Sequence, residues 1–150
     1  IARGALDDTI RFVREHARPW IDSGLDKASD DPLTIIQVGG LDIRLEAAEA
    51  LLERAGKVMD EAKAAPDVEN VAAASVAVAR AKVLTTEVAI EATNKLFELG
   101  GTRSSLRRHA FDRHWRNARV HTLHDPVRWK YHVVGNWRLN GVRPPRHDWS

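Results

Sequence analysis

The chain has 150 residues and no cysteine, so it is long enough to bury a core but cannot form disulfides or thiolate metal sites. No apolar run approaches the roughly 20 residues that span a bilayer, and no signal-peptide pattern opens the chain, so we expect a cytoplasmic protein without a membrane partner. The net charge of +2 conceals a division, because residues 1–102 hold 12 basic and 18 acidic residues, whereas residues 103–150 hold 11 basic and 3 acidic ones. A basic, aromatic-rich segment of this kind suits a phosphate group, a nucleic acid or an acidic neighbouring subunit.

The first residue is not a start methionine, and helical periodicity begins directly after it. We therefore expect residues 1–150 to be a single helical domain that was part of a longer protein. Apolar residues at helical spacing predict a first helix from Ala2 to about Ala17. Pro19 ends this helix, and a loop follows over residues 20–29.

Two long helices are predicted next. The first runs from Pro32 to about Ala64, with proline in its first turn. The second runs from about Val68 to Leu99, where Gly100-Gly101 supplies the stop. Because only a tight turn separates two helices of this length, we expect them to form an antiparallel hairpin.

Each long helix carries one apolar stripe at heptad-like spacing. On the first helix the stripe consists of Leu41, Leu45, Ala48, Leu52, Ala55, Met59 and Ala62. On the second it consists of Val76, Ala79, Val83, Ile90 and Phe97. Two shorter helices are predicted over residues 106–120 and 126–139, followed by an irregular, proline-rich tail. No segment alternates with the period of a strand, so the predicted fold class is all-α, an antiparallel up-and-down helical bundle.

The densest group of polar side chains begins at Asp112. Helical spacing places Asp112, Arg116 and Arg119 on adjoining surface, which favours an internal ion-pair ladder. A structural role of this kind is also favoured for Arg113 over a role in binding a ligand.

Two histidines, His121 and His124, fall at the end of the same helix, just before Asp125. A pair at this spacing could ligate a metal, but a single H-x-x-H is a weak signal and we expect no metal site. Two imidazoles beside a carboxylate can also handle protons near neutral pH. The structural alternative is a pair of capping or interface histidines.

The stretch RNARVHTLHDP, residues 116–126, continues through Trp129-Lys130 and Asn140-Gly141. It resembles the flavin-dependent monooxygenases of organosulfur compounds, within the acyl-CoA dehydrogenase superfamily. The segments ARPW at residues 17–20 and Asp31-Pro32 recur in the same order in that family, so the resemblance covers essentially the whole chain. It implies the C-terminal helical domain of a flavoenzyme that assembles as a dimer or tetramer, with helical and β domains preceding it.

The resemblance also implies roles for individual residues. The histidine matching His124 faces the reactive edge of the flavin, with His121 and Asp125 as its catalytic neighbours. Arginines matching Arg18 and Arg103 hold the flavin phosphate, often that of an adjacent subunit, and guanidinium groups suit such contacts. Backbone N–H groups after Gly100 and Gly101 can approach the same anion.

The implied reaction uses reduced FMN, which a separate flavin reductase supplies, to transfer oxygen to a soft atom such as sulfur in a small-molecule substrate. Most acyl-CoA dehydrogenases carry a catalytic glutamate where this chain has Asp125, whose carboxylate is one methylene shorter. Because a misplaced base is costly, this difference favours oxygen chemistry. The alternatives are an FAD-dependent acyl-CoA dehydrogenase and, from another class, a non-catalytic helical module whose basic tail binds nucleic acid. Since basic blocks are more often solvated faces or subunit contacts, we expect no nucleic-acid partner.

Overall fold

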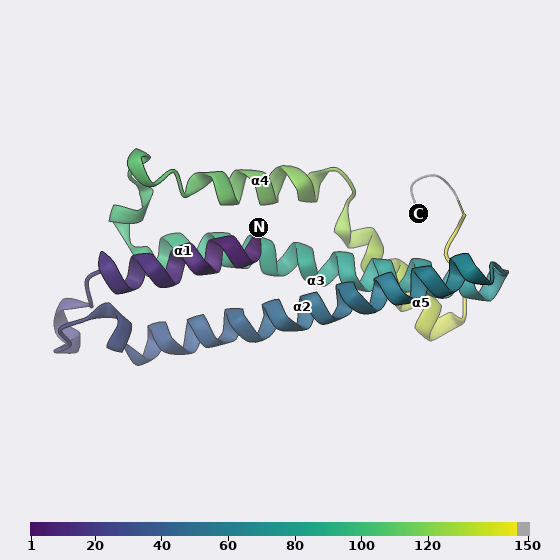
Figure 1. The fold of residues 1–150 in the computed structure, drawn as a ribbon, viewed down its shortest axis with the longest axis horizontal. Helices are drawn as coiled ribbons and strands as arrows, with labels where there is room; N and C mark the ends of the chain where they lie inside the picture. Colours follow the sequence, from purple (N-terminus) through teal and green to yellow (C-terminus); the bar gives the residue numbers. More distant parts are fainter. Residues whose placement is uncertain (147–150) are drawn as a thin grey trace. The chain divides into compact units, whose positions relative to one another are not determined.

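The structure of the chain is a computed structural model, and it describes residues 1–146. These residues form five α-helices and four short 3-10 turns (Figure 1). The helices are α1 (Ala2–Glu15), α2 (Pro32–Ala64), α3 (Val68–Gly100), α4 (Asp112–Leu123) and α5 (Val127–Asn140). No strand occurs in residues 1–146, and the predicted all-α class is confirmed. None of the helices in this range is long and apolar enough to cross a membrane.

The chain divides into two compact units, each of which takes one half of both long helices. Unit 1 comprises residues 1–45 and 87–123, so it contains α1 and α4. Unit 2 comprises residues 46–86 and 124–150 and contains α5. Residues 141–146 have no regular secondary structure, as predicted for the tail, and the rest of the predicted tail lies outside the described residues.

The first helix buries one face in unit 1. Its buried residues recur every three or four positions, as an amphipathic helix requires, and are Ala2, Ala5, Leu6, Thr9, Phe12 and Val13. The helix ends at Glu15, two residues before the predicted end. The amide of Ala17 turns back to the carbonyl oxygen of Phe12 at 3.0 Å, and Pro19 disfavours helical conformation in the residue before it.

Polar side chains cap both long helices at their predicted starts. The carboxylate of Asp31 accepts a hydrogen bond from the amide of Leu33 at 3.0 Å, at the start of α2. At the start of α3, the carboxylate of Asp67 accepts one from the amide of Asn70 at 2.8 Å. Such bonds satisfy amides that have no partner inside the helix. The predicted bounds of the first long helix are confirmed, and α3 extends to Gly100, one residue beyond the prediction.

The apolar stripes of the long helices are only partly those predicted. Five of the seven stripe positions on α2 are buried, whereas Leu52 is 57% exposed and Met59 is also exposed. On α3 the first two predicted positions are buried, but Val83, Ile90 and Phe97 are only half-buried. The buried hydrophobic residues of its second half are instead Val88, Ala92 and Leu96. A strict heptad drifts around a straight helix of 3.6 residues per turn, so a stripe assigned with that period loses register over 30 residues.

The helix predicted over residues 106–120 begins later, at Asp112, and extends to Leu123. Residues 102–105 and 107–109 form 3-10 turns instead. Ala110 then has a φ of 50°, in the left-handed region. Because a left-handed residue cannot continue a right-handed helix, α4 starts only after it.

The turn after α3 depends on two glycines for different reasons. Gly100 is buried, and a Cβ atom there would lie 2.7 Å from the Cβ of Ser104 and 3.1 Å from the ring of Phe12. Gly101 has a φ of +66°, which side chains rarely adopt. Packing and backbone conformation therefore account for both glycines without a ligand.

Candidate active site

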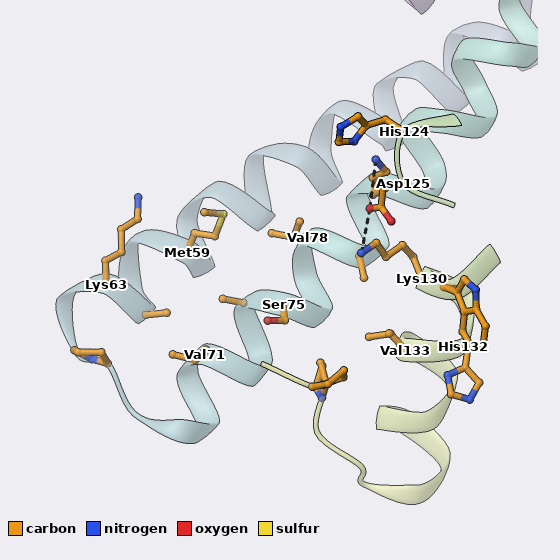
Figure 2. Close-up of a pocket in the computed structure, with 18 residues that line it drawn as sticks. Met59, Lys63, Val71, Ser75, Val78, His124, Asp125, Lys130, His132 and Val133 are labelled. Atoms are coloured by element: carbon orange, nitrogen blue, oxygen red, sulfur yellow. Dashed lines mark ion pairs between the residues drawn. The ribbon is translucent and has the colours of Figure 1, made fainter. Parts of the chain in front are cut away.

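A pocket of about 1000 Å³ lies in unit 2, where residues of α2, α3 and α5 line it (Figure 2). Most of its wall is apolar, formed by Met59, Ala62, Pro66, Val71, Ala74, Val78, Ala79, Trp129, Val133, Pro144 and Pro145. Its titratable side chains are Lys63, Lys82, His124, Asp125, Lys130 and His132. The pocket therefore combines an apolar body with a small number of charged groups, as ligand pockets usually do.

Asp125 is paired with two lysines of this pocket. Its carboxylate lies 3.1 Å from Nζ of Lys130 and 3.6 Å from Nζ of Lys82 (Figure 2). Burial acts to raise the pKa of Asp125, but the hydrogen bond and charge of Lys130, together with those of Lys82, outweigh it and lower the pKa below its ordinary value. Asp125 is therefore a weaker proton acceptor than an ordinary aspartate.

His124 lies between α4 and α5 and lines the same pocket as Asp125. Its side chain is exposed, and Figure 2 shows it on the Asp125 side of the pocket, away from Lys63. Two of the three predicted catalytic residues thus line one pocket.

The third predicted catalytic residue, His121, belongs to unit 1. It is exposed on the last turn of α4 and lines a shallow groove of about 500 Å³ together with Trp115 and Val120. Residues 1–146 contain no group of three or more His, Cys, Asp or Glu side chains that could hold a metal ion.

The polar residues at the start of α4 make structural ion pairs. Arg116 lies 3.0 Å from Asp112, which confirms this pair of the predicted ladder, whereas Arg119 makes no ion pair within residues 1–146. Arg113 donates to the carboxylate of Asp8 on α1 at 2.7 Å, and Nε2 of His114 lies 2.7 Å from the same carboxylate oxygen. The side chain of Asp8 is only 13% exposed, so this contact ties α1 to α4 within unit 1.

The carboxyl of Asp8 has an altered acidity. Burial acts to raise its pKa, but the hydrogen bond from His114 and the charges of Arg113, His114 and Arg11 outweigh burial and lower the pKa. Because the pKa is lower in the folded than in the unfolded protein, the stabilisation is complete above the unfolded value of about 3.9. It is lost as the pH falls through the lower folded value.

We expect Asp8→Asn to lower the free energy of unfolding at pH 5 by about 1–3 kcal/mol, because Arg113 and His114 lose their anionic partner. Urea unfolding should show a smaller difference from the unsubstituted protein at pH 3, where that protein begins to lose the same contribution. Asp7→Asn is the matched control, since Asp7 is an exposed neighbour on α1, and it should change stability by less than about 0.5 kcal/mol. Equal costs for the two variants, or a difference that does not depend on pH, would contradict this role of Asp8.

The two arginines predicted to hold a phosphate are exposed in unit 1. Arg103 donates from Nη1 to the carbonyl oxygen of His16 at 3.4 Å, so it reaches the segment that carries Arg18 two residues later. The side chain of Arg18 makes no hydrogen bond or ion pair with the other residues of the range 1–146. Since a guanidinium has five N–H donors, both arginines retain donors for an anion.

Lys82 and Lys130 line the pocket but were not predicted as site residues. A signal was present for Lys82, because it follows Val78 and Ala79 by one helical turn and so places a charge on their apolar face. Lys130 belongs to the Trp129-Lys130 pair through which the resemblance continues, but the resemblance implied no role for it.

Comparison with known proteins identifies relatives of this chain. The family described as acyl-CoA dehydrogenase, C-terminal domain, matches residues 1–129. Over 147 residues the chain is 38% identical to a dibenzothiophene monooxygenase of Mycolicibacterium goodii and 35% identical to a probable FMNH2-dependent monooxygenase, SfnC, of Pseudomonas putida. These alignments cover 96% of this chain but only 35% and 37% of the two relatives.

Solved structures give the same result. The FMN-bound structure of TdsC from Paenibacillus sp. A11-2 has 38% identity and a TM-score of 0.93. Methanesulfinate monooxygenase MsuC from Pseudomonas fluorescens has 34% identity and a TM-score of 0.94. Both comparisons cover 99% of this chain, but only 38% and 39% of those chains.

This chain therefore spans slightly more than a third of the length of the curated relatives that it matches. The family match extends over most of the chain, and the predicted resemblance is confirmed. The chain belongs to the acyl-CoA dehydrogenase C-terminal domain family.

Proposed function

We propose that this chain is the C-terminal helical domain of a two-component flavin-dependent monooxygenase that oxidises an organosulfur or related small apolar molecule. The observation that carries the proposal is an identity of 34–38%, over nearly the whole chain, with proteins named as monooxygenases. One of them is named for its dependence on FMNH2 and another for dibenzothiophene. In the whole protein, helical and β domains would precede residues 1–150.

The residues present fit an anionic flavin such as FMN. Arg18 and Arg103 are exposed cations with unused donors, which is the chemistry that a flavin phosphate requires. Gly101 has a positive φ and is exposed, and within residues 1–146 only its chain neighbours could lie within 4 Å of a Cβ built there, so its backbone is accessible beside Arg103. When bound in reduced form, the flavin supplies the electrons that activate oxygen.

We assign the protein's own steps to the pocket of unit 2. Its apolar wall would exclude water from the reacting atoms, and the imidazole of His124 would hold a proton at the site of oxygen transfer. Asp125 would contribute negative charge beside His124. His121, on the last turn of α4, would be the second catalytic neighbour of His124. These three assignments rest on the resemblance of residues 116–126 to the motif of the family.

An FAD-dependent acyl-CoA dehydrogenase is the rival function, with Asp125 as the base. The pairing of Asp125 with Lys82 and Lys130 argues against the dehydrogenase function. It lowers the pKa of Asp125, and a carboxylate with a lowered pKa is a weaker proton acceptor.

We also propose the partners that this function requires. They are a separate flavin reductase, a small-molecule substrate, and further copies of the protein in a dimer or tetramer. The acidic residues 1–102 and the basic residues 103–150 have opposite net charges, which favours contact between copies. The absence of cysteine is compatible with the reducing cytoplasm.

The proposed function is tested with the protein that includes the preceding domains. The protein is supplied with FMN, a flavin reductase, NADH and dibenzothiophene or a dialkyl sulfide under 18O2. We expect a product that carries 18O on sulfur, and no product when the reductase is omitted. Oxidation of an acyl-CoA thioester by tightly bound FAD, without oxygenation of any sulfur compound, would establish the rival function instead.

A further inference from the structure

The charges of the unit 2 pocket do not balance. Its lining includes the cations Lys63, Lys82 and Lys130 but only one acid, Asp125. The carboxylate of Asp125 is shared between Lys130 at 3.1 Å and Lys82 at 3.6 Å, so it can neutralise only one of them.

The two shared lysines are well placed to act on a ligand. Their side chains are only 17% and 23% exposed, for Lys130 and Lys82 respectively, so solvent screens their charges less than those of surface lysines. The side chain of Lys63, by contrast, is exposed, and Figure 2 shows it on the opposite side of the pocket from Lys130. One uncompensated positive charge is therefore held in a partly enclosed, largely apolar space.

We propose that this pocket binds small organic anions that have an apolar body, with Lys82 and Lys130 as the anion-binding residues. The apolar wall of Val71, Val78 and Trp129 accepts the body of such a ligand. The excess lysine charge accepts its acidic head group. Asp125 sets the strength of the site, because it cancels one of the two lysine charges.

The site is tested by calorimetric titration of the purified, flavin-free protein with benzenesulfinate and with methyl phenyl sulfone. The two probes share an aryl group and an SO2 group, but only the sulfinate is charged. We expect benzenesulfinate to bind at least tenfold more tightly than the sulfone, because only the anion uses the lysine charge.

Charge variants should move the affinity in opposite directions. Lys82→Met should weaken benzenesulfinate binding about tenfold or more, since it leaves a neutral Lys130–Asp125 pair. Asp125→Asn should tighten binding severalfold, because both lysine charges become available. Lys57→Met is the matched control, as Lys57 pairs with Glu53 on the surface of α2 and does not line the pocket. Simple loss of folding cannot produce this pattern, because it would weaken binding in every affected variant.

Equal affinity for the two probes, no measurable binding of either, or weakening by Asp125→Asn would overturn the proposal. The measurement needs no flavin, oxygen or turnover. Failure here would therefore leave the oxygenation of neutral sulfur compounds untouched, and failure of the oxygenation assay would leave the anion site standing.

Discussion

His124→Ala should reduce oxygenation of substrate by about 10²–10⁴-fold while the helical fold and oligomeric state are retained. A group that donates or accepts a proton in the transition state typically contributes a factor of this size. The exposed position of His124 in the unit 2 pocket means that its removal leaves no cavity in a core, so a stability effect should be small. The measurement is the rate of product formation with chemically reduced FMN and oxygen, which removes dependence on the reductase.

A graded variant separates chemistry from packing at this position. His124→Asn keeps a donor and an acceptor but cannot carry an exchangeable positive charge near neutral pH. If His124 holds a proton during turnover, the asparagine variant should remain close to the alanine variant in rate. Product formation within threefold of the unsubstituted protein in both variants would remove His124 from the mechanism.

Arg18→Ala and Arg103→Ala should each weaken FMN binding by roughly tenfold or more. Loss of one charge-assisted contact to phosphate costs on the order of 1.5–3 kcal/mol. Fluorescence titration of FMN with each variant measures the effect. Riboflavin, which lacks the phosphate, should bind to the variants and to the unsubstituted protein with similar affinity.

Arg14→Ala provides the matched control for the arginine variants. Arg14 is an exposed arginine on the last turn of α1, four residues before Arg18. The control removes the same charge from the same end of the helix and should change FMN affinity by less than threefold. If all three variants weaken binding equally, the effect would come from general charge rather than from a phosphate contact.

Most of the helical fold could be predicted from the sequence because local signals mark it. Asp31 and Asp67 accept hydrogen bonds from amides in the first turns of α2 and α3, which lack partners inside the helix. Such capping residues can be recognised in the sequence, so the start of each long helix could be predicted. The start of α4 could not be predicted, because it depends on Ala110, an ordinary residue in a left-handed conformation that its sequence does not announce. The predicted stripe on α3 was wrong beyond Ala79. Positions repeated every seven residues drift around a straight helix of 3.6 residues per turn, so they leave the buried face over that length.

The candidate site shows a different limit. His121, His124 and Asp125 lie within five consecutive positions and could be found from the sequence, but their distribution between unit 1 and unit 2 is a tertiary property. The pairing of Asp125 with Lys82 joins positions that are 43 residues apart. Nothing local to either residue encodes that contact, so the lowered pKa of Asp125 emerges only from the folded chain.

The two lysines around Asp125 also restrict how this scaffold could be redesigned. Thioester dehydrogenation needs a basic carboxylate, and Asp125→Glu restores the length of the glutamate side chain found in most acyl-CoA dehydrogenases. The longer acid would still stand among Lys82 and Lys130, whose charges favour its ionised form and reduce its basicity. Conversion would require neutral replacements on α3 and α5 at the same time, which makes a change of activity by single substitutions inaccessible at this position.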